Sequence, residues 1–227
     1  MRFLVSFCIC TYNREEGLHT LLNSIQKINL NDAINEKNVQ VIIVDNFNGK
    51  SNKIINSIKK FKFKFKWYHE KRQGLSNARN KTVELSNDSE FCLFVDDDQK
   101  IDKNCLLELF KTQKKYDADV VYGSNPPIYD ITPSNYIDYF FKAKFKKKYD
   151  YKIRVAPTNC TLIKKETLNN IDGPFNILFN QTGGEDSFLT RGLHLKGAKM
   201  YRSVKAKAFE IIPKSRWINY YVKLINF

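Results

Sequence analysis

Three aspartates stand in a row, Asp96, Asp97 and Asp98, directly after an apolar stretch that begins at Phe91. Carboxylates this close repel one another, so the cluster calls for a compensating partner. A hard divalent cation such as Mg²⁺ or Mn²⁺ would serve, because these ions take oxygen ligands from carboxylates and from substrate phosphates. A solvated turn that caps the next helix, with Asp102 as the N-cap, explains the same letters equally well.

A second acidic cluster, TGGEDSFL, occupies residues 182–189. Its two glycines let the backbone approach a ligand closely. Glu185 and Asp186 then fall in the first turn of a predicted helix, where the positive end of the helix dipole stabilises carboxylates. An aspartate kept ionised in this way can act as a general base. Ordinary acidity at a helix N-terminus is the competing explanation.

The elements that must position these acids follow from hydrophobic patterning. Strand-like runs occupy 3–10, 39–46, 91–98 and 118–124. A strictly alternating run at 61–69 predicts a half-buried strand near a sheet edge. Apolar residues fall at helical spacing over 18–28, and further helix-like runs occupy 50–60, 74–86 and 103–115. This alternation predicts an α/β fold with a mostly parallel sheet and helices on both faces. Ligands of such sheets gather at the carboxyl ends of the strands. Polar residues lie at three of these ends, which suggests a single site.

The second half of the chain has a different pattern. APTNCTLIKKETL (156–168) predicts a strand running into a short helix, a helix starts near Glu185 and ends by Gly197, and MYRSVKAKAFEIIP (200–213) predicts one or two strands. We expect one domain, in which residues 1–125 form a nucleotide-binding half and residues 126–215 complete the site. Residues 216–227 would form a basic aromatic tail.

Composition restricts the partners. The net charge of +14 predicts attraction to an anionic membrane surface, a nucleic acid or a phosphorylated substrate. No helix-turn-helix, zinc-finger or RNP-type motif occurs, so we expect no specific nucleic acid partner. The five cysteines include no CxxC pair, which disfavours a disulfide framework or zinc site and favours a reducing cytosol. No run approaches the roughly 20 apolar residues that span a bilayer.

Taken together, the motifs resemble a known family. CICTYNREEGLHTLLNSI, VIIVDN, GLSNARN, LFVDDD and GGEDSFL occur in the order and spacing of family 2 glycosyltransferases with the GT-A fold, over roughly residues 3–216. The sequence resembles in particular bacterial members that build exopolysaccharide or lipopolysaccharide. The resemblance implies a Rossmann-like central sheet with a smaller acceptor-side β region. It also implies an inverting, metal-dependent transfer from a nucleotide-diphosphate sugar, with UDP as carrier, to a saccharide or lipid-linked acceptor.

The resemblance assigns roles to individual positions. The residues that match its nucleotide-sugar site are Cys10, Thr11, Tyr12, Asn13, Arg14, Asp45, Arg79, Asp96 and Asp97. Asp45 would read the uracil edge, and Asp98 of the DXD-type motif would ligate Mn²⁺ or Mg²⁺. Glu210 would be a further metal ligand, as in some members. Asp186 would be the catalytic base, while Glu185 and Gly184 would contact acceptor or donor sugar.

Two features depart from the family pattern. Members often read VDDGSTD after the second strand, whereas this chain reads VDNFNGKSN, so that Asn46 replaces the second aspartate. This departure lies where family members contact the ribose and base beyond Asp45. It therefore bears on those contacts and on the expectation that UDP is the carrier. The chain also ends at Phe227, where relatives commonly continue with a basic aromatic tail, so we expect a chain that is either naturally short or truncated.

Other functions remain open. A nucleotidyltransferase would carry a Gly- and Arg-rich loop after the first strand, which CTYNREEG is not. A retaining hydrolase also uses paired carboxylates, a DNA- or RNA-binding protein would fit the charge, and an inactive family member could act as a binding module. YFFKAKFKKKYDYK (139–152) could lie on an anionic membrane, clamp a lipid-diphosphate acceptor, close over the donor or form a solvated loop. We expect a cytoplasmic protein attached peripherally to the inner face of the cytoplasmic membrane.

Overall fold

The computed structural model describes residues 2–47, 61–135, 138–139, 147–169 and 171–213. Its strands are β1 (Phe3–Thr11), β2 (Val39–Asp45), β3 (Lys64–His69), β4 (Ser89–Asp96), β5 (Gln99–Ile101), β6 (Val120–Ser124), β7 (Pro127–Tyr129), β8 (Tyr151–Lys152), β9 (Thr161–Lys164) and β10 (Met200–Ile212). Its helices are α1 (Glu15–Ile25), α3 (Leu75–Leu85), α4 (Cys105–Tyr116), α6 (Lys165–Asn169) and α7 (Glu185–Leu195), with a 3₁₀ turn, η2, at Ile177–Phe179.

The first half of the chain forms the parallel part of a ten-stranded sheet, in the order β3-β2-β1-β4. Every residue of β2 is buried, as expected for a strand covered on both faces. The alternating run forms β3, which is half exposed and lies at the sheet edge, as predicted. Parallel register places Thr11 beside Asp45 and Cys10 beside Asp96. The polar ends of three strands therefore meet at one edge.

The second half extends this sheet. Strand β9 is inserted antiparallel between β4 and β6, and β10 runs parallel to β6. The predicted α/β class with a mostly parallel sheet is confirmed. Patterning missed β5, which follows the three aspartates, because three residues are too few for a recognisable alternation. Strand β5 pairs with β10 and places Glu210 opposite Gln99, at the same edge as the aspartates.

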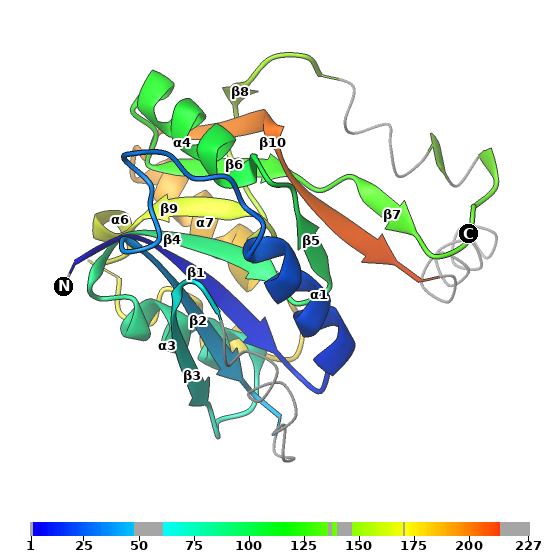
Figure 1. Ribbon diagram of the computed structural model, residues 1–227. Helices are drawn as coiled ribbons and strands as arrows, with labels where there is room; N and C mark the ends of the chain where they lie inside the picture. The colour runs from blue at the N-terminus through cyan, green and yellow to red at the C-terminus, as the bar shows by residue number, and fades with distance from the viewer. Residues whose placement is uncertain (1, 48–60, 136–137, 140–146, 170, 214–227) are drawn as a thin grey trace, which may run out of the picture.

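Helices cover both faces of the sheet (Figure 1). On one face, α4 packs against β6 and β10 and α1 against β5, and Leu18, Leu22 and Leu106 of these helices belong to one apolar core with side chains of β1 and β2. On the other face, the side chains of α3, α6 and α7 pack around Phe175, which is fully buried. Among the described residues, no helix combines the length and the apolar character that crossing a membrane requires. The predicted helix at 50–60, half of the basic segment at 139–152 (residues 140–146), and the tail lie outside the described residues.

Helix α3 joins the two halves of the chain. The side chain of Asn80 makes two hydrogen bonds to the backbone of Phe175: its amide donates to the carbonyl at 2.7 Å, and its carbonyl accepts from the N–H at 2.9 Å. At the start of the helix, the Ser76 N–H donates to Asn180 Oδ1 at 2.9 Å. Gly74 has φ +126°, and a Cβ there would lie 2.2 Å from Asn180 Cγ. Glycine is needed because of this backbone conformation and close approach.

We expect Asn80→Ala to lower the free energy of unfolding by about 1–3 kcal/mol, because it leaves a buried donor and acceptor of Phe175 without partners. Urea denaturation measures this change. Asn77→Ala is the matched control, because Asn77 lies on the same helix and is half-buried like Asn80, but it donates to the carbonyl of Gln73, just before α3, and so does not bridge the two halves. It should cost no more than about 0.5 kcal/mol. Equal effects of the two variants would contradict a bridging role for Asn80.

Candidate functional site

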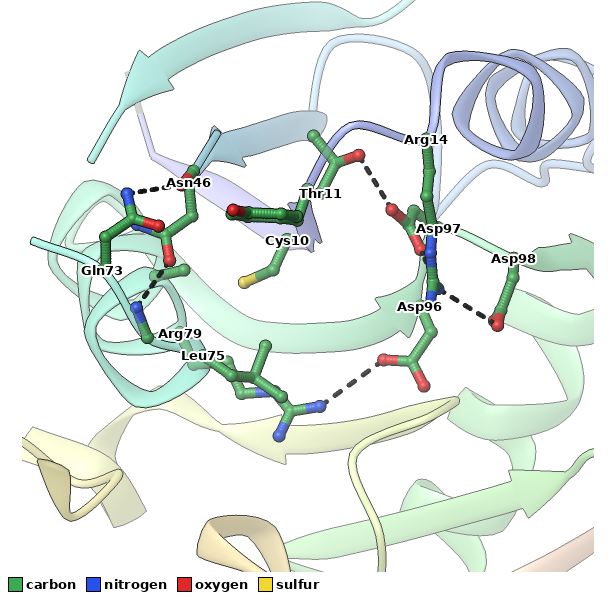
Figure 2. A pocket seen from close by; sticks show the side chains of 13 residues that line it. Cys10, Thr11, Arg14, Asn46, Gln73, Leu75, Arg79, Asp96, Asp97 and Asp98 are labelled. Atoms are coloured by element: carbon green, nitrogen blue, oxygen red, sulfur yellow. Dashed lines mark hydrogen bonds and ion pairs between the residues drawn. The ribbon is translucent and has the colours of Figure 1, made fainter. Parts of the chain in front are cut away.

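A cavity of about 540 Å³ opens at the carboxyl ends of β1, β2 and β4, beside the start of α3. Figure 2 shows the side chains that line it. They are Cys10, Thr11, Tyr12, Arg14, Asn46, Gln73, Gly74, Leu75, Ala78, Arg79, Asp96, Asp97 and Asp98. Most of the residues assigned to nucleotide-sugar binding from the sequence therefore share one cavity. Asn13, with φ +52°, and Asp45 do not belong to this wall.

Asp97 holds the loop after β1 in place. It is 5% exposed, accepts a hydrogen bond from the Thr11 hydroxyl at 2.8 Å, and pairs with the Arg14 guanidinium at 3.0 Å. Burial raises the pKa of Asp97, while Thr11 and Arg14 lower it. Arg14 also contacts Asp98 at 3.3 Å, so one arginine partly offsets two of the three aspartates. The repulsion seen in the sequence is thus relieved in part by protein cations.

Arg79 connects the two acidic clusters. Its guanidinium pairs with Asp96 at 3.5 Å and with Glu185 at the start of α7, and it lies over the ring of Phe175. Arg79 and Glu185 are 7% and 2% exposed, so this is a buried ion pair. Glu185 Oε2 is also buried and has no hydrogen-bond partner among the residues that the structure describes. The structure therefore brings the DDD and GGED motifs together through one side chain.

The carboxylates that surround Asp96 are only partly offset by Arg79. Its pKa is raised to about 6, chiefly by burial, and Asp98, Asp97 and Glu210 add to this, whereas Arg79 acts in the opposite direction. Glu210, named as a metal ligand from the sequence, is thus close enough to affect Asp96. Carboxylate oxygens fit a hard divalent cation. The described residues hold no preassembled group of three or more metal-ligating side chains, so a cation here would need ligands from the donor as well.

Asn46 closes the cavity on the side of β2. Its amide donates to the carbonyls of Glu70 and Arg72, each at 2.8 Å, and its side-chain oxygen accepts from the Gly74 N–H at 2.8 Å. An aspartate could accept from Gly74 but could not donate to two carbonyls. The residue that departs from the family pattern therefore fixes the loop that leads into α3. The structure thus supplies a physical reason for an amide at this position.

Asp45 lies beneath this loop. It is 3% exposed, and one of its oxygens accepts from the Phe47 N–H at 2.9 Å. Burial raises its pKa, and the Phe47 N–H and His69 lower it. Its assigned contact with the uracil edge stays a prediction. Tyr12 is 56% exposed in the cavity wall and packs edge-on against Phe47 at 5.3 Å, which gives the mouth of the cavity an aromatic surface.

Asp186 lies in the first turn of α7, as predicted, and is half buried. Gly184 forms the N-cap with φ +94°, which favours glycine. One carboxylate oxygen of Asp186 accepts from the Thr158 N–H at 3.3 Å, and the other accepts from the Ser187 N–H at 2.6 Å. These bonds orient the carboxylate. Asp186 is not part of the cavity wall and is linked to it through its neighbour Glu185 and Arg79.

Sequence reasoning missed several residues of the site. Gln73, Leu75 and Ala78 line the cavity, and the GLSNARN motif was the available signal, because it places them at the start of a helix facing the strand ends. Thr158 was missed as the donor to Asp186. Its position in the TNCT stretch gives no spacing pattern that would connect it to a residue so far along the chain.

The mostly parallel sheet and the acidic side chains at its carboxyl edge define an α/β protein with a candidate active site at the strand ends. The family model "Glycosyl transferase family 2" matches residues 6–172, and the chain belongs to this family. The expected GT-A fold and glycosyltransferase class are thereby confirmed. The chain is 25% identical over 213 residues to the succinoglycan biosynthesis protein ExoM of Rhizobium meliloti, covering 92% of this chain and 67% of ExoM.

Solved structures share the fold. A crystal structure of S. aureus TarS in complex with UDP superposes with a TM-score of 0.70 at 20% identity and covers 96% of this chain and 63% of that chain. The mannosyltransferase PcManGT from Pyrobaculum calidifontis, in complex with GDP-Man and Mn²⁺, gives a TM-score of 0.69 at 16% identity and covers 100% of this chain and 65% of that chain. This chain therefore spans a little under two thirds of the length of the chains in these two structures.

We expect Asn46→Asp to destabilise the protein by about 2–4 kcal/mol and to weaken donor binding, because two carbonyls lose their donor and face a negative charge instead. Urea denaturation and donor titration measure the two effects. Asn23→Asp makes the same chemical change on an exposed face of α1 and should leave both quantities nearly unchanged. If Asn46→Asp behaved like this control, the three hydrogen bonds of Asn46 would not be holding the loop.

Proposed function

We propose that the protein transfers a sugar from a nucleotide-diphosphate sugar to a saccharide or lipid-linked acceptor, with inversion, in bacterial surface polysaccharide synthesis. The observation that carries this proposal is the buried Arg79 bridge, which joins the cavity of the DDD motif to the helix that bears Asp186. The family membership and the likeness to ExoM support the reaction class and the pathway.

The cavity is the proposed donor site. Its volume suits a nucleotide, and its exposed Tyr12 offers an aromatic face to a base. TarS was solved with UDP, which supports UDP as the carrier in this chain, whereas PcManGT was solved with GDP-Man. We propose UDP, with Asp45 below the base and Arg14 and Arg79 on the side of the phosphates.

A divalent cation, Mn²⁺ or Mg²⁺, fits the acidic edge. Asp98 would hold it, and Glu210, which affects the pKa of Asp96 from strand β10, would contribute a further carboxylate. When bound, the ion would offset the charge that develops on the departing diphosphate. The presence of Mn²⁺ in PcManGT supports this choice of metal.

Asp186 is the proposed catalytic base. Its carboxylate accepts backbone hydrogen bonds at the start of α7, which hold it in one orientation, and a positioned carboxylate can take a proton from a hydroxyl group. The acceptor oxygen would lose its proton to Asp186 while it attacks the anomeric carbon, so no covalent enzyme intermediate is needed. The nearby thiol of Cys10 stays protonated at neutral pH, because burial raises its pKa to about 12.

The location proposed for the protein is the cytoplasm. All five cysteines are free, and the sulfur atoms of Cys105 and Cys160 lie 3.5 Å apart without a bond. Two neighbouring buried thiols that stay reduced fit a reducing compartment. Peripheral attachment to the membrane stays a prediction that concerns segments outside the described residues.

We expect Asp186→Asn to lower kcat by about 10²- to 10⁴-fold while changing donor affinity less than twofold, because the amide keeps the shape of the side chain but cannot take a proton. Release of nucleoside diphosphate measures turnover, and titration calorimetry measures affinity. Asp172→Asn, at an exposed position, is the control. Full turnover in Asp186→Asn would mean that another group is the base.

We expect a UDP-sugar at about 100 times its Kd to raise Tm by roughly 5–10 °C in the presence of Mn²⁺, and EDTA to abolish most of the shift. Asp98→Ala should remove the Mn²⁺-dependent part, because a ligand of the ion is lost. Asp32→Ala, at an exposed position, should retain it. A thermal-shift screen of nucleotide sugars with and without Mn²⁺ measures these effects. No stabilisation by any of them would contradict donor binding.

A further inference from the structure

A second cavity, of about 200 Å³, lies where β6, β8 and β10 meet and shares no lining residue with the proposed donor site. We call it the basic cavity. Its wall consists of Ser124, Pro126, Lys147, Tyr151, Arg202, Val204, Lys207 and Phe209. Three of these residues are cationic, and none of the described wall residues is an aspartate or glutamate. A concave surface of one charge sign concentrates ions of the opposite sign.

Aromatic side chains position the cations of the basic cavity. The Arg202 guanidinium lies over the ring of Tyr122, 5.0 Å from its centroid, and donates a hydrogen bond to the Tyr151 hydroxyl at 3.2 Å. The Lys147 ammonium lies 3.9 Å from the centroid of the Tyr151 ring. An aromatic ring attracts a cation without cancelling its charge. These contacts order two of the cations, and the described wall residues carry three positive charges and no negative one.

The carboxylate next to this wall has partners of its own. One oxygen of Asp150 accepts from the Val204 N–H at 3.0 Å, and the other accepts from the Thr112 hydroxyl at 2.9 Å. Asp150 thereby fixes β8 against β10 and α4. Asp150 keeps its negative charge, but these two bonds fix its carboxylate toward β10 and α4, and the three cations of the wall outnumber it.

The basic cavity is connected to the catalytic end of the molecule. The segment that starts at Tyr151 in its wall continues to Thr158, whose N–H donates to Asp186. Fully extended, this segment spans at most about 25 Å. On β10, Lys207 of the wall lies three positions before Glu210. One elongated acceptor could therefore present a hydroxyl to Asp186 while an anionic group occupies the basic cavity.

We propose that the basic cavity binds a phosphate ester group of the acceptor, an inference that rests on the proposed transferase function. A phosphate monoester carries a charge of about −1.5 to −2 at neutral pH and several strong acceptor oxygens, which match three cations with N–H donors. The cavity is smaller than the roughly 300–1,000 Å³ of sites that enclose a drug-sized ligand, so it suits an end group. Its concave shape favours such a group over a flat membrane surface.

Titration calorimetry with butyl phosphate and with inorganic phosphate, in EDTA, tests this proposal on the full chain without any need for turnover. We expect butyl phosphate to bind, and Lys207→Ala and Lys147→Ala each to weaken binding about tenfold. Both lysines are exposed, so these variants should fold. Lys205→Ala removes the same charge from the same strand at an exposed position outside the wall, and it should change the affinity less than twofold.

Four results would overturn the proposal. Equal weakening by Lys205→Ala and Lys207→Ala would indicate attraction by the overall charge, and loss of binding in Arg14→Ala alone would place the anion in the donor cavity. Binding of inorganic phosphate without butyl phosphate would indicate a free ion. Lys207-dependent binding to phosphatidylglycerol vesicles without butyl phosphate binding would indicate a membrane surface. The thermal-shift screen tests the transferase function separately, so each failure is recognised by its own assay.

Discussion

The architecture of this site depends on one buried cation. Arg79 reaches from α3 to Asp96 at the end of β4 and to Glu185 at the start of α7, with Phe175 beneath it. Removing one partner of a buried ion pair is costly, because it leaves an uncompensated charge away from water. The three segments must therefore meet in one arrangement. The helix that carries Asp186 is held against the donor cavity by the same constraint.

The other contacts around α3 act in the same direction. Asn80 fixes the backbone at Phe175, and Asn46 fixes the loop that enters the helix through three hydrogen bonds. Amides suit both tasks, because one side chain donates and accepts at the same time. Neutral and cationic side chains thus fix the backbone segments that carry the acidic residues of the site. The charges most exposed to ligand, Asp96 and Asp98, lie where this framework ends.

The parts of the fold that sequence patterning predicted are those dominated by local burial. Strands β1, β2 and β4 read as continuous apolar runs because both faces are covered, and α7 begins where the pattern placed it. The insertion of β9 between β4 and β6, and the short strand β5, could not be predicted in this way. Pairing partners depend on contacts between distant segments, which leave no local period.

By itself, the sequence determined the class of the site. It placed carboxylates at strand ends and at the start of a helix, in the order found in glycosyltransferases. It could do so because residue type and local periodicity determine where a buried strand ends and polar residues begin. Only the tertiary structure decided how these groups are paired. In the folded chain, Asp97 accepts hydrogen bonds from Thr11 and Arg14. Glu185 pairs with Arg79, and Asp186 accepts a hydrogen bond from Thr158. These partners lie far apart along the chain, so no local pattern links them. Strand pairing within the first half brings Asp97 to Thr11, and packing of the two halves around α3 brings Glu185 to Arg79.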